Sequence, residues 1–79
     1  MYIFIGEDVM IRSKDIIAIV NRESLLSTYE YEYFIEKNEK KVIRLGENEC
    51  KSIVVTHQNI YLSPFASTTL KKRTLKPLL

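Results

Sequence analysis

The stretch YIFIGEDVMIRSKDIIAIV, Tyr2 to Val20, decides the fold class of this chain. Tyr2 to Ile5 is a run of β-branched and aromatic residues, Gly6 to Asp8 has the composition of a turn, and Val9 to Ile11 resumes the apolar pattern. This order predicts a β-hairpin. Ile16 to Val20 is an apolar run without alternation, which is typical of a central strand with protein on both faces. Such a strand needs a second layer, from a helix or from another subunit.

The segment from Asn21 to Lys40 is compatible with either a strand or a helix. Tyrosine and glutamate alternate from Tyr29 to Tyr33, with the two-residue period of a half-buried strand. A helix is favoured because the segment is longer than a typical strand and because Ser27, followed by Glu30, resembles a capping box.

This helix would direct one apolar stripe at the core, formed by Leu25, Leu26, Tyr29, Tyr33 and Phe34. Tyr31 and Ile35 would then lie on the face away from that stripe. We therefore predict that Tyr31 and Ile35 contact another subunit, although isolated exposed apolar residues are also common on monomers.

The remainder of the chain is predicted to return to strands. Val42 to Leu45 and Ser52 to Thr56 have strand composition, and the residues between them suggest a hairpin connection. His57 to Asn59 is a polar turn that leads into a further strand, Ile60 to Leu62. Ser63 and Pro64 then have the pattern of a helix start, which predicts a helix of one to three turns through Phe65 and Leu70.

These elements predict an α+β fold, namely a small strand-rich subunit of five to six short, mostly antiparallel strands with one central helix and a short C-terminal helix. The 79 residues make a single domain, 1–79, in which residues 74–79 are expected to form a flexible basic tail. A domain of this size has a small core, and its single cysteine, Cys50, cannot form an internal disulfide. We expect self-association to supply the missing stability.

Charge is distributed unevenly along the chain. Residues 1–49 contain seven basic and ten acidic residues, a net charge of −3, whereas residues 50–79 contain five basic residues and no acid, a net charge of +5. A clustered positive field attracts phosphate groups even when the average charge is small. Charge alone does not distinguish a polyanionic partner from a solvated surface that keeps the protein in solution.

The chemical groups that catalysis or metal binding would need are sparse in the sequence. His57 is the only histidine and lies in a predicted polar turn, and together with Cys50 it supplies too few ligands for a tetrahedral zinc site. The two glycines form no phosphate-binding loop. We expect a non-enzyme without cofactor, metal or small-molecule substrate. The longest apolar run is also too short to span a bilayer, so we expect a soluble cytoplasmic protein without a membrane partner.

Several short stretches, taken in order, resemble the RemA/RemB family of extracellular matrix regulators of Gram-positive bacteria, and most closely its RemB branch. They are Ile3–Gly6, Val9–Ser13, Asp15–Val20, Glu23–Ser24, Ile60–Pro64 and Thr69–Arg73, whereas Leu25 to Lys51 matches least well. The resemblance implies a small α+β subunit that assembles into homo-oligomeric rings. It also implies a transcriptional regulator that binds duplex DNA to activate biofilm matrix genes, through phosphate neutralisation and DNA deformability.

The chain departs from this family at its DNA contacts. RemA-type members carry adjacent arginines in a turn after the helix, where this chain has Gly46-Glu47-Asn48-Glu49, and another arginine where this chain has Lys14-Asp15. Acids in such a turn would repel phosphate. The residues that we expect to contact DNA phosphates are Arg12, Lys14 and Lys51 on a rim, with Lys71, Lys72 and Arg73 as a second patch. Each of them is equally compatible with a solvated charge.

An oligomeric protein-interaction adaptor without nucleic-acid binding is the main alternative. The acidic turn at residues 46–49 and the tyrosines of the central helix favour it, since tyrosine is enriched at protein interfaces. The two hypotheses differ in the geometry of charge. Basic residues that converge on one continuous surface support DNA binding, and basic residues scattered among acids support the adaptor.

Overall fold

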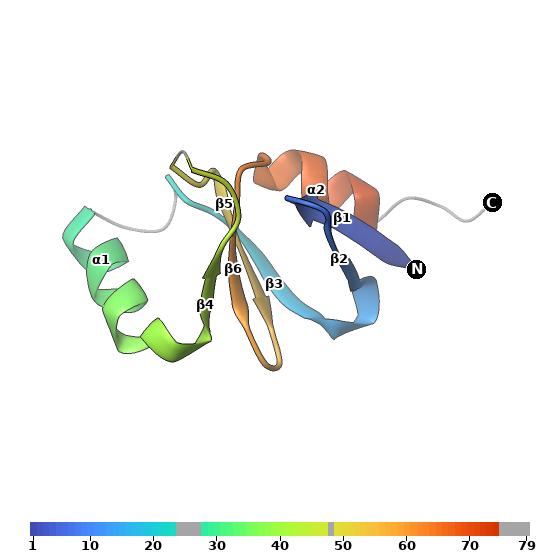
Figure 1. Cartoon of the computed structure of the whole chain (residues 1–79). Helices are drawn as coiled ribbons and strands as arrows, with labels where there is room; N and C mark the ends of the chain where they lie inside the picture. Colours follow the sequence, from blue (N-terminus) through green and yellow to red (C-terminus); the bar gives the residue numbers. More distant parts are fainter. Residues whose placement is uncertain (24–27, 48, 75–79) are drawn as a thin grey trace.

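The computed structural model describes residues 1–23, 28–47 and 49–74, and this part of the chain has the expected α+β class (Figure 1). Its strands are β1 (Tyr2–Gly6), β2 (Val9–Arg12), β3 (Ile16–Asn21), β4 (Val42–Arg44), β5 (Ser52–Thr56) and β6 (Ile60–Ser63). Its helices are α1 (Thr28–Lys37) and α2 (Ser67–Thr74), with short 3-10 helices η1 (Ser13–Asp15) and η2 (Glu39–Lys41). The predicted capping residue Ser27 lies outside the described residues. Thr74 belongs to α2, and the rest of the expected tail, residues 75–79, also lies outside them.

The strands β1 and β2 form the predicted hairpin. They are antiparallel, with Tyr2 opposite Arg12 and Phe4 opposite Met10. The turn requires positive φ at Gly6 (133°), and a Cβ atom placed on Gly6 would lie 2.8 Å from Cδ of Pro64. Glycine is therefore needed at position 6 both for the backbone conformation and for the close approach of the chain after β6.

The other four strands form one sheet in the order β3-β5-β6-β4. The strand β5 is antiparallel to both β3 and β6, which confirms the predicted turn at His57 to Asn59. The predicted hairpin between residues 42–45 and 52–56 is wrong, because β4 pairs in parallel with β6, with Val42 opposite Ile60. The local β5–β6 hairpin places β6 next to β5, so that β6 lies between β5 and β4 in the sheet. The chain that leaves β4 therefore crosses over the position of β6 before it enters β5.

The predicted central position of Ile16 to Val20 is also wrong. The strand β3 pairs only with β5 among the described strands and is an edge of the sheet. Its side chains are half-buried or exposed, and Ile17 is 57% exposed. The run lacks alternation because this edge strand has apolar contacts on both faces: Ile16 and Ile19 pack against the core cluster that contains Val54, and Val20 packs against the one that contains Ile53.

The strands β5 and β6 are covered on both faces. On one face the hairpin, α2 and the residue after β4 pack with Val54 of β5 in a core cluster, formed by Ile3, Ile5, Leu45, Val54 and Leu70. On the other face lies a second cluster, formed by Cys50, Ile53, Ile60 and Leu62. Figure 1 shows the hairpin and α2 on one side of the sheet and α1 on the opposite side. The fold therefore has three layers with the sheet in the middle.

The segment before β4 is a helix, as predicted, but its buried face differs from the predicted one. Tyr31, Phe34 and Ile35, at spacings of three and four, pack against the second cluster. Tyr29 and Tyr33 are 76% and 52% exposed, so they do not form the core stripe. Leu25 and Leu26, which would have extended the predicted stripe, lie outside the described residues. Tyr31 and Ile35 thus do not face away from the core, and their role in a subunit contact stays a prediction.

The helix α2 begins at Ser67 and not at the predicted Ser63-Pro64. The Ser63 side chain has another role, because its Oγ donates a hydrogen bond of 2.7 Å to the carbonyl of Ile5 and accepts one of 3.0 Å from the N–H of Phe65. Ser63 therefore ends β6 and connects it to β1. The eight residues of α2 agree with the predicted length. None of the described helices is both long and apolar enough to cross a membrane.

We expect Ser63→Ala to lower the free energy of unfolding by about 1–3 kcal/mol, because it leaves the Ile5 carbonyl and the Phe65 N–H without this partner in a buried place. Urea denaturation followed by circular dichroism measures the change. Ser13→Ala, which removes a hydroxyl from the partly exposed η1, is the control and should change stability by less than about 0.5 kcal/mol. Equal losses for the two variants would contradict the role given to Ser63.

Candidate nucleic-acid interface

The six basic residues predicted to contact DNA lie at three places in the structure. Arg12 and Lys14 are at the end of β2 and in η1, Lys51 directly precedes β5, and the remaining three, Lys71, Lys72 and Arg73, are in the second half of α2. The side chains of all six are exposed. They therefore need to be considered as three groups with different surroundings.

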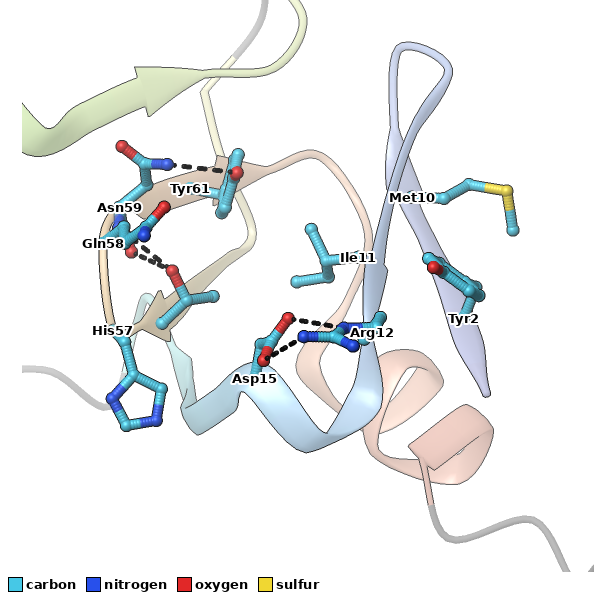
Figure 2. Close-up of a pocket in the computed structure, with 10 residues that line it drawn as sticks. Tyr2, Met10, Ile11, Arg12, Asp15, His57, Gln58, Asn59 and Tyr61 are labelled. Carbon is cyan, nitrogen blue, oxygen red and sulfur yellow. Dashed lines mark hydrogen bonds and ion pairs between the residues drawn. The ribbon is translucent and has the colours of Figure 1, made fainter.

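Arg12 is already paired with an acid. Its Nε lies 3.1 Å from Oδ2 of Asp15, and both side chains are partly exposed. Figure 2 shows this pair at the rim of a hollow between the β1–β2 hairpin and the β5–β6 turn, with His57 at the opposite side. An exposed ion pair of this kind contributes little to stability. The carboxylate of Asp15 also halves the net charge of this group, from +2 for Arg12 and Lys14 alone to +1. This group is the weakest of the three candidates.

Arg73 has a structural role within the subunit. Its Nη1 donates a hydrogen bond of 2.8 Å to the carbonyl of Phe4, and its guanidinium lies 5.1 Å from the centre of the Phe65 ring. These contacts hold the end of α2 against β1. Lys71 and Lys72 are exposed on the same helix, in which the described residues include no acid. The positive charge that α2 offers to a partner therefore comes mainly from its two lysines.

Lys51 lies beside a second cation that the sequence reasoning missed. The backbone N–H of Arg22 donates to the carbonyl of Lys51 at 3.1 Å. Both residues line a hollow of about 470 Å³ together with Ala66, Ser67 and Thr68 at the start of α2. Arg22 and Lys51 are thus placed near the helix N-terminus, where the aligned peptide dipoles also favour anions. The β3–β5 register could have revealed this pairing, because Asn21 opposite Ser52 brings residues 22 and 51 together.

The Arg22 side chain is held by Tyr31 of α1. Its guanidinium lies 3.6 Å from the centre of the Tyr31 ring, close enough for a cation–π interaction. The Tyr31 hydroxyl lies 3.3 Å from Sγ of Cys50, and burial together with this hydrogen bond raises the pKa of Tyr31, although Arg22 opposes the shift. The ring therefore holds the Arg22 guanidinium against α1.

Acids share the surroundings of Lys51. Glu23 and Glu49 line the same hollow as Arg22 and Lys51. Glu47, two residues before Glu49, is also exposed. The acidic turn noted in the sequence therefore lies next to the cations that would bind phosphate. This local charge balance weakens any anion binding at the hollow, and the surplus of positive charge lies farther along α2.

The raised pKa of Tyr31 makes stability depend on alkaline pH. The neutral hydroxyl is favoured in the folded state, so its contribution is complete below pH 10, the ordinary tyrosine pKa, and is lost as the pH rises through the raised value. We expect Tyr31→Phe to reduce the fall in unfolding free energy above pH 10, as measured by urea denaturation at a series of pH values. Tyr29→Phe, at an exposed position, should follow the wild type. Parallel curves for Tyr31→Phe and wild type would contradict this.

Comparison with known proteins places these features in a family. The family described as extracellular matrix regulatory protein A-like, or RemA-like, matches residues 2–74. The chain is also 44% identical over 73 residues to extracellular matrix regulatory protein B of Bacillus subtilis (strain 168), an alignment that covers 92% of this chain and 89% of the relative. The expected relationship to the RemA/RemB regulators is confirmed, and the chain belongs to the RemA-like family of extracellular matrix regulatory proteins.

Proposed function

We propose that this protein is a ring-forming, DNA-associated transcriptional regulator of the extracellular matrix. It acts in the cytoplasm without enzymatic activity or cofactor, and it binds duplex DNA through backbone and shape. Membership of a matrix regulatory family supports the regulatory part of this proposal. The arrangement of cations around α2 supports the DNA-binding part.

The observation that supports DNA binding is a group of four cations near the two ends of α2, of which Arg22 has its guanidinium on Tyr31 of α1. Arg22 and Lys51 lie at the start of the helix, and Lys71 and Lys72 lie toward its end. We call these four residues the α2 band. A helix of eight residues is about 12 Å long. A duplex carries one phosphate charge per ~1.7 Å of its axis, so a surface of this length can reach several phosphates.

Repetition of the α2 band around a ring would turn a weak contact into a strong one. A single copy supplies four cations, and Glu23 and Glu49 partly offset them. Copies joined in one assembly bind the same duplex at high effective concentration, so that their small contributions combine. Lysine and arginine contacts to phosphates carry no direct sequence information, and selectivity in this proposal arises from the shape and deformability of the DNA.

The adaptor hypothesis is the second candidate. It is favoured by Tyr29 and Tyr33, two exposed aromatic side chains on α1 that the core does not use. The adaptor predicts an assembled protein that does not retain duplex DNA at low salt. The DNA regulator predicts retention that falls steeply as salt increases.

We expect the double variant Lys71→Ala, Lys72→Ala to have a flatter salt dependence than the wild type. The negative slope of log K against log salt concentration should decrease in magnitude by about 0.9 for each phosphate that is no longer neutralised, hence by about 1.8 for both lysines. Fluorescence anisotropy with a labelled duplex measures the slope. Arg73 is left intact because it supports β1. The matched control is Lys40→Ala combined with Lys41→Ala, two exposed lysines of η2, which should leave the slope unchanged. Equal slopes for wild type and the α2 variant would remove these lysines from the site.

We expect Glu49→Gln to tighten DNA binding about two- to fivefold at low salt, because it removes a carboxylate that lines the hollow with Lys51. The same anisotropy titration measures the change. Glu36→Gln, on the exposed surface of α1, makes the same charge change away from the α2 band and should leave the affinity unaltered. An effect of the same size in both variants would indicate a general charge effect and contradict a local role for Glu49.

A further inference from the structure

The first turn of α2 offers backbone donors that no described residue accepts. The N–H of Leu70 donates to the carbonyl of Ala66 at 3.1 Å, so Ala66 is the N-cap residue of this helix. Alanine has no side-chain acceptor and is a poor N-cap. The N–H groups of residues 67–69 consequently have no hydrogen-bond acceptor in the described part of the chain. A helix start of this kind favours an anionic ligand.

Ser67, the first residue of α2, is buried, but its hydroxyl is unpaired. The residue is 5% exposed, and its Oγ has no hydrogen-bond partner among the described residues. In the same part of the chain no fully enclosed polar side-chain atom lacks a partner, so this Oγ opens onto the hollow that Ser67 lines with Arg22 and Lys51. Buried hydroxyls are usually hydrogen-bonded. The hydroxyl of Ser67 is therefore available to a ligand that enters the hollow.

Two cations complete this group of donors. Lys51 is exposed at the hollow and forms no ion pair with an acid of the described residues. The guanidinium of Arg22 rests on the Tyr31 ring, yet its side-chain N–H groups have no acceptor in the described ranges. Charged donors, free backbone N–H groups and a hydroxyl are together the groups that bind the oxygens of a phosphate.

The rest of the hollow suits a hydroxylated carbon skeleton. The exposed carboxylates of Glu23 and Glu49 line it, and carboxylates accept hydrogen bonds from hydroxyl groups. Because these two acids balance the two cations, they disfavour a ligand with several phosphates, whereas the dipole and the free donors of α2 still favour a single one. The volume of about 470 Å³ exceeds that of a phosphate group and lies within the range of small-molecule sites.

We propose that this hollow binds a sugar phosphate, with the terminal phosphate at the start of α2 and the sugar hydroxyls at Glu23 and Glu49. A terminal phosphate projects from one end of its ligand and can reach the Ser67 hydroxyl. A phosphate of duplex DNA has a sugar on each side, which keeps it away from a hydroxyl that is buried to this extent. Arg22 and Lys51 belong both to this site and to the α2 band, but binding of a sugar phosphate does not require that the protein binds DNA.

Isothermal titration calorimetry of the full chain with ribose 5-phosphate tests the proposal. We expect saturable binding to the wild type, binding of inorganic phosphate that is at least about tenfold weaker, and no binding of ribose at the same concentrations. Ser67→Ala should weaken the binding of ribose 5-phosphate at least about tenfold, because it removes a buried hydrogen bond to a charged group. Lys51→Gln, a change at an exposed position that leaves the fold intact, should weaken it at least about fivefold.

The matched control is Thr69→Ala, which removes an exposed hydroxyl from the same turn of α2 but not from the lining of the hollow. It should keep the wild-type affinity within about twofold, and circular dichroism verifies that all three variants fold. A wild type that does not bind ribose 5-phosphate, equal affinities for this ligand and inorganic phosphate, or wild-type affinity in Ser67→Ala or Lys51→Gln would each overturn the proposal.

Duplex binding by Ser67→Ala, measured by fluorescence anisotropy, distinguishes a sugar phosphate from a backbone phosphate as the partner of this hydroxyl. We expect the variant to retain the duplex affinity of the wild type. A loss of duplex affinity would assign the hydroxyl to the DNA backbone and would also overturn the proposal. The calorimetric titrations contain no DNA, so a failure of the wild type to bind a duplex is a separate result.

Discussion

The burial of β5 and β6 between two layers is the constraint on which the rest of the structure depends. Val54 turns to the layer of the hairpin and α2, and Ile53 and Leu62 turn to the layer of α1. A chain of 79 residues can cover both faces of two strands only by using nearly all its other elements as covers. The hairpin and the helices consequently direct one face at the core, and much of the opposite face of each is exposed.

The fold class followed from the sequence because its signals are local. The turn at Gly6, the polar turn at His57 and the helical region before β4 each depend on residues near in sequence, and all three were predicted correctly. The errors concern the order of strands. Nothing near Val42 indicates that its partner is Ile60 and not the strand that follows directly. Tertiary packing decides such pairings, and it also decided which face of α1 is buried.

The candidate site was only partly predictable for the same reason. The basic cluster of α2 was visible because its members are consecutive, but its arginine turned out to support β1. Arg22 was missed because it lies far in sequence from Lys51, and only the register of β3 with β5 brings the two residues together. Charge counts along the sequence located the consecutive cations of α2, whereas the other members of the α2 band depended on strand pairing.

The contact between Arg22 and Tyr31 links the residue after β3 to α1, a helix that packs against the sheet through few side chains. The strands β5 and β6 are held from both sides, whereas α1 is anchored mainly by the side chains of Tyr31, Phe34 and Ile35. Segments with few buried contacts open at lower free energy than the global unfolding of a domain. Each local opening of α1 withdraws the aromatic ring from beneath the Arg22 guanidinium. Order in α1 and the rigidity of this arginine are thus thermodynamically coupled, and a ligand that immobilises either one slows the amide hydrogen exchange of the other.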